Sequence, residues 1–219
     1  MRASGVGPGD LVLDLGAGTG RLTSPLAGVA RKVVAVERDP LLADGLRRRG
    51  WSNVDVVEAD AVELPLPREP FRVVANVPFA RTNDLLHLLF DDPRTPLVRA
   101  DLVVEWGVGV KRALPWPSSV NGVLWSARYE ILVARRLPPS AFDPPPAVAA
   151  AVVVFRRRDE PLVPLELSHE YGSFVARGFR RGLGAVAPPA AVHKVAARGA
   201  TARELDAFQW ADLFQLCRS

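Results

Sequence analysis

The chain has 219 residues, 48% of them hydrophobic, and its 28 basic and 24 acidic side chains give a net charge of +4. This length and apolar content suffice for one full α/β domain plus a small addition, and the charge alone does not identify a nucleic-acid-binding protein. No apolar run could cross a bilayer or act as a signal peptide, and Cys217 and three scattered histidines exclude a disulfide framework and a convincing metal site, so we expect a cytoplasmic protein with no membrane partner and no metal.

The first predicted element is a buried strand over 11–16, which breaks into a glycine-rich turn followed by a helix over about 20–30. Gly16 and Gly18 allow the backbone to turn tightly and approach a ligand, and Gly20 allows the helix to pack against the strand. The spacing D-x-G-x-G-x-G differs from the dinucleotide pattern G-x-G-x-x-G, in which a pyrophosphate sits on the helix N-terminus. It suits a ligand without phosphates, such as S-adenosylmethionine. The predicted cofactor-binding residues of this loop are Asp14, Gly16, Ala17, Gly18 and Gly20.

The next two predicted strands, over 32–37 and 54–58, flank a helix at about 40–49 and end near acidic residues. Glu37 lies about 20 residues beyond the first glycine, where a carboxylate can accept both ribose hydroxyls, although an NAD enzyme would share that acid. Asp60 could accept a hydrogen bond from an adenine amino group. Each acid could instead be a solvated loop residue. However, the ends of the first three predicted strands each supply a group that fits the cofactor, namely the glycine loop, Glu37 and Asp60. Arg38 and Ala61, next to these acids, join the predicted cofactor-binding set.

The fourth predicted strand, over 71–76, ends in Asn76-Val77-Pro78-Phe79, which indicates an amine-methylating site. The exocyclic amine of a nucleobase is a poor nucleophile because its lone pair is delocalised into the ring. The Asn76 side-chain oxygen and the Val77 carbonyl can accept its N–H bonds while Phe79 stacks on the base. Pro78 favours an extended backbone that turns these groups into a cleft, and Asn76 also joins the cofactor-binding set. The alternative is a strand end followed by an ordinary turn.

The remaining strands of the sheet are predicted over 101–106, 128–134 and 148–156, with helices at about 82–90 and 107–114. This βαβ order predicts a Rossmann-like, mostly parallel α/β sheet with the carboxyl ends of its strands on one rim. The last two strands should be antiparallel neighbours, because the connection over 137–146 is too short for a crossover helix. We expect this domain to cover residues 1–159.

From about residue 160 the strand pattern stops, and Tyr171, Phe174, Val175 and Phe179 recur at helical spacing. We expect a small helical RNA-binding domain over 160–219, with a loop between helices over 182–189 and with these aromatic residues in its core. The planar guanidinium of arginine suits phosphate, although a GC-rich genome and solvated helix faces would also enrich arginine. The predicted RNA-binding residues are Arg156, Arg157, Arg158, Arg177, Arg180 and Arg181.

The motifs together resemble the Erm group of ribosomal RNA adenine methyltransferases, relatives of the small-subunit dimethyladenosine transferases. The matching segments, in chain order, are VLDLGAGTGRLTSPLA, VVAVERDP, VVEADAVELPLP, FRVVANVPF, LVVEWGVGVKRAL, AFDPPPAVAAAVVVFRRR and QWADLFQL. The resemblance implies a class I methyltransferase fold that uses S-adenosylmethionine to methylate the N6 amine of an adenine. It further implies a monomer that acts on naked or partly assembled large-subunit (23S) ribosomal RNA and so confers macrolide-type antibiotic resistance.

Two departures from the family pattern leave other functions open. Family members begin with a Gln-Asn-Phe-Leu segment that closes over the methionine end of the cofactor, whereas this chain starts at Met1-Arg2-Ala3-Ser4 directly before the first strand. We expect either a gene start further upstream or a more open site with weaker cofactor binding. The second departure is Ala149, at the position after the Pro-x-Val step where family members often have an acidic residue, so we expect one polar contact near the target to be missing. The alternatives are an RNA-binding pseudoenzyme, a small-subunit RNA or DNA adenine methyltransferase, and a small-molecule methyltransferase, which has less use for an arginine-rich tail.

Overall fold

The computed structural model describes residues 4–218, so the expectation for the start of the chain at 1–3 lies outside the described residues. The chain forms two compact units. The sheet unit comprises Met1–Gly109 and Val133–Arg156, and the helical unit comprises Val110–Leu132 and Arg157–Ser219. The boundary expected between residues 159 and 160 lies close to Arg157. The helical unit also takes in 110–132, which the sequence analysis left with the sheet.

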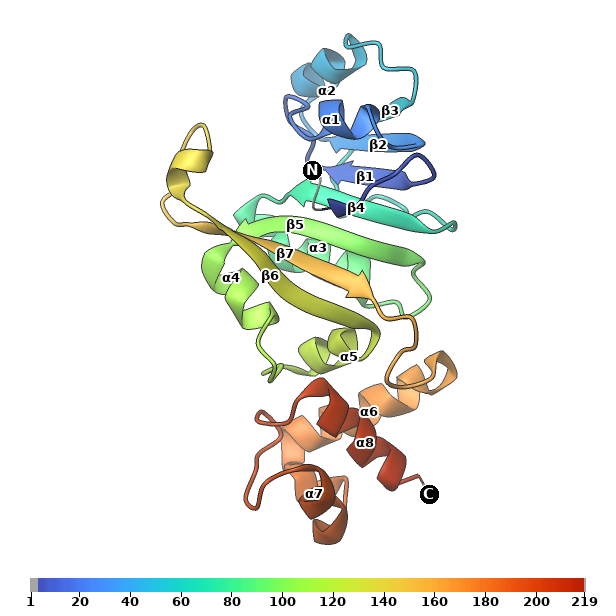
Figure 1. Ribbon diagram of the computed structural model, residues 1–219, viewed down its shortest axis with the longest axis vertical. Coiled ribbons are helices and arrows are strands. Elements are labelled where there is room, and N and C mark those ends of the chain that lie inside the picture. Colours follow the sequence, from blue (N-terminus) through green and yellow to red (C-terminus); the bar gives the residue numbers. More distant parts are fainter. Residues whose placement is uncertain (1–3, 219) are drawn as a thin grey trace. The chain divides into compact units, whose positions relative to one another are not determined.

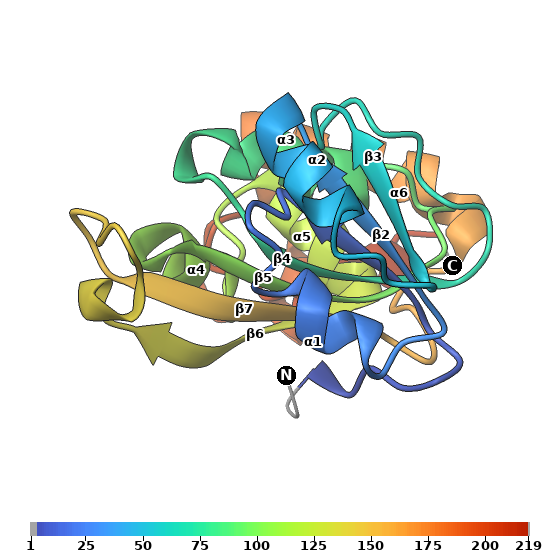
Figure 2. The same ribbon diagram turned by 90° about the horizontal axis from the view of Figure 1, so that it is seen from above.

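The sheet has seven strands in the order β3-β2-β1-β4-β5-β7-β6 (Figure 1). The strands are β1 (Leu11–Leu15), β2 (Lys32–Glu37), β3 (Val54–Glu58), β4 (Phe71–Asn76), β5 (Leu97–Glu105), β6 (Tyr129–Leu137) and β7 (Ala150–Arg157). The pairs among β1 to β5 are parallel, and β7 runs antiparallel to β5. The predicted fold class is therefore confirmed. β6 and β7 are neighbours, as expected, and the short connection between them carries the 3-10 turn η3 (Pro139–Ala141), seen at the left of Figure 2.

Four helices follow strands of the sheet: α1 (Thr23–Ala27), α2 (Pro40–Arg47), α3 (Thr82–Phe90) and α4 (Trp106–Arg112). The helix α1 is shorter than the predicted span of 20–30. It begins after Gly20, whose φ of 83° a right-handed helix cannot include, and it ends at Ala27, with Gly28 as its C-cap. The helix α2 begins where predicted because the Asp39 side chain accepts hydrogen bonds from the backbone N–H groups of Leu41 and Leu42. Within the described part of the chain, no helix is long and apolar enough to cross a membrane.

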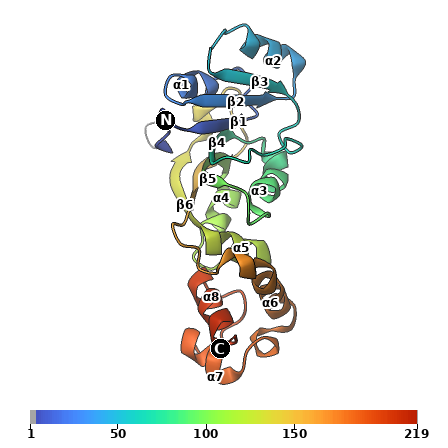
Figure 3. The same cartoon turned by 90° about the vertical axis from the view of Figure 1, so that its right-hand side faces the viewer.

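The helical unit contains α5 (Val120–Arg128), α6 (Ser168–Arg181), α7 (Pro189–Val195) and α8 (Ala207–Leu216), of which α5 was not predicted. Figure 3 shows α5 beside α6 and α8. Two 3-10 turns, η4 (Leu165–Leu167) and η5 (Leu183–Ala185), precede α6 and α7. The turn η5 falls inside the expected loop over 182–189. The helical nature of the tail is thus as predicted.

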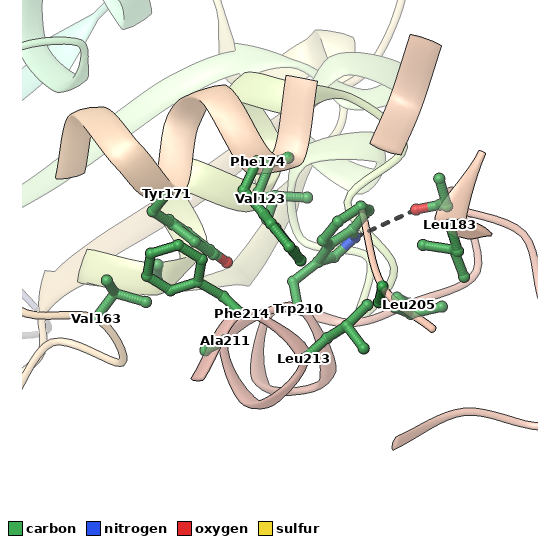
Figure 4. Packing of buried hydrophobic residues seen from close by; sticks show 14 of the residues in the cluster. Val123, Val163, Tyr171, Phe174, Leu183, Leu205, Trp210, Ala211, Leu213 and Phe214 are labelled. Carbon is green, nitrogen blue, oxygen red and sulfur yellow. Dashed lines mark hydrogen bonds between the residues drawn. The ribbon is translucent and has the colours of Figure 1, made fainter. Parts of the chain in front are cut away.

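An aromatic core holds the helical unit together (Figure 4). The ring of Phe174 makes edge contacts with Trp210 and Phe214, at centroid distances of 6.1 and 5.3 Å. Trp210 is fully buried, and its indole N–H donates to the Ala202 carbonyl at 3.2 Å, so its one polar atom is satisfied. Val123 of α5 belongs to the same core. This burial explains why α5 belongs to the helical unit although it precedes β6 in the chain.

Candidate active site

The candidate site lies at the carboxyl ends of β1, β2, β3 and β4, all in the sheet unit. The sheet order places β1 between β2 and β4, so the connections from β1 and β4 diverge at this point. A cavity of about 320 Å³ opens at this edge. Its lining residues are Leu15, Gly16, Val36, Glu37, Arg38, Ala59, Asp60, Ala61, Val62, Val77, Pro78, Ala80, Arg81 and Leu85.

Seven of the predicted site residues therefore border one cavity, with contributions from all four strand ends. They are Gly16, Glu37, Arg38, Asp60, Ala61, Val77 and Pro78. Asp14, Ala17, Gly18, Gly20, Asn76 and Phe79 belong to the same strand ends and the segments that follow them, but they are not among the lining residues. The assignment of individual roles to all these residues stays a prediction.

The glycine loop after β1 has the backbone that its sequence predicts. Gly16, Gly18 and Gly20 have φ values of 77°, 57° and 83°, a region in which side chains are strained. The backbone N–H groups of Gly16 and Ala17 both donate to the Val36 carbonyl, at 2.9 and 3.0 Å. A Cβ on Gly20 would lie 2.8 Å from Leu46 Cδ2, so glycine is needed there for packing as well as for the turn.

The carboxylate of Glu37 is held rigidly at the end of β2. Its Oε2 accepts the backbone N–H of Gly18 at 2.8 Å, and its Oε1 accepts that of Asp39 at 2.9 Å. The side chain is buried. Each carboxylate oxygen has a second lone pair, so both can accept one further hydrogen bond from a pair of hydroxyls. Glu37 thereby links the glycine loop to the start of α2.

Asp14 is a fully buried carboxyl group beneath the glycine loop. Its Oδ2 accepts a hydrogen bond from Thr23 Oγ1 at 2.6 Å, whereas its Oδ1 has no hydrogen-bond partner within residues 4–218. Burial raises the pKa of Asp14 to about 6; the Thr23 hydrogen bond acts against this rise and the negative charge of Glu37 adds to it. An unpartnered buried carboxylate oxygen beside a glycine loop fits a ligand that brings a positive charge.

The loop after β4 carries the acceptor motif Asn76-Val77-Pro78-Phe79. Asn76 is exposed, whereas Val77 is buried, and the Val77 N–H donates to the Val103 carbonyl of β5 at 3.1 Å. Pro78, with φ of −54° and ψ of 124°, leads into the 3-10 turn η2 (Phe79–Arg81), in which Phe79 is half-buried. A Cβ on Gly16 would lie 3.8 Å from both the Asn76 carbonyl oxygen and Pro78 Cδ. The glycine loop and the acceptor motif therefore lie next to each other, and Gly16, Val77 and Pro78 line the same cavity.

Arg81 is a charged residue of the cavity that was not among the predicted site residues. Its Nη2 lies 3.3 Å from Oδ2 of Asp60, whose Oδ1 accepts the backbone N–H of Val62 at 3.2 Å. The Arg81 N–H donates to the Pro78 carbonyl at 2.8 Å, which closes η2. The only signal in the sequence was a cation directly after the acceptor motif. The apolar lining residues Val62, Ala80 and Leu85 carried no chemical signal at all.

The predicted RNA-binding arginines fall in two elements. Arg156 and Arg157 end β7, and Arg177, Arg180 and Arg181 lie on α6, where all three are exposed. Arg158 instead packs within the helical unit, where it contacts Ser126 and Phe208. Its Nε donates to the Ser126 carbonyl at 3.0 Å, and its guanidinium lies 5.0 Å from the Phe208 ring centroid. Its side chain is only 15% exposed, so a structural role accounts for it without RNA.

Comparison with known proteins gives consistent matches. The family model described as ribosomal RNA adenine dimethylase matches residues 2–186. An rRNA adenine N-6-methyltransferase of Corynebacterium diphtheriae is 33% identical over 181 residues, which are 80% of this chain and 70% of that protein. The mycinamicin-resistance protein MyrB of Micromonospora griseorubida is 33% identical over 220 residues, covering 94% of this chain and 70% of the relative.

Among solved structures, the crystal structure of the 23S rRNA methyltransferase ErmE matches with a TM-score of 0.87 and 28% identity. This match covers 100% of the present chain and 95% of the other. The chain spans between 54% and 70% of the length of the first curated relatives that it matches.

Proposed function

The chain belongs to the ribosomal RNA adenine dimethylase family, and we propose that it transfers methyl groups from S-adenosylmethionine to the N6 amine of an adenine in ribosomal RNA. The resemblance to Erm-type enzymes expected from the sequence is confirmed by the family model and the relatives. One observation carries the proposal: the glycine loop and the acceptor motif line the same cavity, through Gly16 on the first and Val77 and Pro78 on the second.

The residues present fit S-adenosylmethionine. Glu37 offers two fixed carboxylate oxygens to the ribose hydroxyls, and Asp60, which also lines the cavity, offers an acceptor to the adenine amine. The unpartnered Oδ1 of Asp14 provides a place for a positive charge, which the ammonium of the methionine part carries. When bound, the cofactor supplies an electrophilic methyl group on its sulfonium.

The acceptor motif prepares the target amine. Asn76 accepts one N–H of the amine through its side-chain oxygen, and the Val77 carbonyl accepts the other, which favours the pyramidal nitrogen that develops in the transition state. Because these bonds strengthen as the nitrogen changes shape, they lower the barrier and do not merely bind the base. Phe79 stacks on the extruded adenine, a contact worth about 1–3 kcal/mol in other base–aromatic pairs. Positioning amine and methyl group in line needs no strong base.

We assign the target to large-subunit ribosomal RNA and the biological result to resistance against macrolide-type antibiotics. The support is the similarity to ErmE, a 23S rRNA methyltransferase, and to the mycinamicin-resistance protein MyrB. The exposed arginines of α6 supply phosphate contacts, which position RNA without reading its sequence. We propose that the chain acts as a monomer on naked or partly assembled RNA.

The test is transfer of radiolabelled methyl groups to naked large-subunit RNA, small-subunit RNA and DNA in parallel. We expect label in large-subunit RNA alone, and none with the Asn76→Ala variant. Label in small-subunit RNA or DNA instead would contradict the target. Absence of label in all three, with cofactor still bound by the protein, would favour an RNA-binding pseudoenzyme.

A further inference from the structure

Arg81 connects the acceptor motif to the cofactor cavity through three contacts. Its backbone N–H closes the turn onto Pro78, its Nη2 lies 3.3 Å from Asp60 Oδ2, and its Nε lies 3.3 Å from Asp84 Oδ2 without hydrogen-bond geometry. The side chain is 40% exposed and borders the cavity. An arginine has five N–H donors, so these contacts leave donors of the guanidinium for a ligand.

The Asp60–Arg81 pair presents an acceptor and a donor side by side at the cavity. The Asp60 carboxylate is fixed by the Val62 N–H on one oxygen and by Arg81 on the other. One edge of adenine carries the N6 amino donor next to the N7 acceptor, and a side-chain amide recognises this edge with one acceptor and one donor. The ion pair offers the same complementary set, spread over two side chains.

We propose that Arg81 donates a hydrogen bond to N7 of the cofactor's adenine while Asp60 accepts from its N6 amine. Arg81 is then a specificity-determining residue of the cofactor site. Because it also closes the turn that begins with Phe79, filling the cofactor site fixes the segment that stacks on the target base. This inference rests on the proposed function, since it presumes S-adenosylmethionine as the cofactor.

The experiment measures binding of S-adenosylhomocysteine and its 7-deaza and 1-deaza analogues to the full chain by calorimetry. The 7-deaza analogue replaces only the N7 acceptor by C–H. We expect the unaltered protein to bind it about 10-fold more weakly than S-adenosylhomocysteine, as for a lost hydrogen bond to a charged group. The variant Arg81→Met should bind S-adenosylhomocysteine about 10-fold more weakly and should no longer distinguish the two.

The matched control is Arg94→Met, which removes an exposed arginine paired with Asp92 outside the cavity, and it should behave as the unaltered protein. Equal affinity of the unaltered protein for the 7-deaza analogue would overturn the inference. The inference would also be overturned if Arg81→Met still bound S-adenosylhomocysteine 10-fold more tightly than the 7-deaza analogue. It would likewise be overturned if the unaltered protein bound the 1-deaza analogue more weakly than S-adenosylhomocysteine and Arg81→Met abolished that difference. If Arg81→Met does not fold, the analogue ratio of the unaltered protein still decides. Failure of the unaltered protein to bind S-adenosylhomocysteine would instead contradict the proposed function itself.

Discussion

Replacing the buried Asp14 by asparagine should change how the stability of the protein depends on pH. Burial raises the pKa of this carboxyl from 3.8 to about 6 in the folded chain. The folded state therefore binds more protons than the unfolded state between these two values, so the free energy of unfolding falls as the pH rises through this window. This difference in pKa corresponds to about 3 kcal/mol of stability, which is present below pH 3.8 and is lost by about pH 7, one unit above the folded-state pKa.

The asparagine side chain of Asp14→Asn cannot ionise, so this variant should not lose unfolding free energy in this way as the pH rises. Between pH 3 and pH 8 the unfolding free energy of the unaltered protein should fall by about 3 kcal/mol relative to that of Asp14→Asn. Urea unfolding at several pH values measures the difference. Asp55→Asn is the control, because Asp55 is an exposed partner of Lys32 on the sheet. Parallel pH profiles for the unaltered protein and Asp14→Asn would refute the argument that burial raises this pKa.

Three further changes test the glycine loop, the acceptor motif and the basic helix. Gly20→Ala should lower the unfolding free energy by about 2–4 kcal/mol, because the alanine would be held at a positive φ and its Cβ would lie 2.8 Å from a neighbouring side chain. Gly18→Ala should lower it by only about 1–2 kcal/mol, because no atom lies within 4 Å of the new Cβ. Urea unfolding compares the two variants, and equal losses would contradict the packing role of Gly20. Asn76→Ala should abolish methyl transfer and leave calorimetric binding of S-adenosylhomocysteine nearly unchanged, since equal losses would make it a cofactor residue. Replacing Arg177 and Arg180 together by alanine should reduce the slope of log affinity for RNA against log salt by about 1–2, and an unchanged slope would exclude α6 from phosphate contact.

The sequence predicted β1 and β4 well because these strands are largely buried. The run before Gly16 and the run before Asn76 are almost wholly apolar, as parallel strands covered on both faces must be. The strand β5 was predicted too short, starting at 101 instead of Leu97. The charged Arg99 fell outside the predicted strand, but its guanidinium donates two hydrogen bonds of 2.7 and 2.8 Å to the Asp101 carboxylate. The charges are thus compensated within the strand.

The helix α5 could not be predicted from its own residues. Its burial depends on α6 and α8, which follow much later in the chain, and Val123 and Ala127 join their core. The candidate site divides in the same way. Glycines, acids and the acceptor motif carry a chemical signature, whereas Leu85 lines the cavity only because the fold brings α3 there. Arg81 lacked a signature because its role depends on a contact with Asp60 across the sheet.

The two units alternate along the chain, so a protein made from its N-terminus on the ribosome begins the helical unit before the sheet unit is complete. Residues 110–132 emerge before β7 is made, yet the core that buries Val123 is completed by Trp210 and Phe214, which follow much later in the chain. During this interval Val123 and Ala127 of α5 lack their core partners on α6 and α8. Exposed apolar surface in a nascent chain favours aggregation. A chaperone that shields residues 110–132 until α8 emerges would raise the yield of folded protein. Residues 157–219 expressed alone would lack α5 and therefore part of their hydrophobic core.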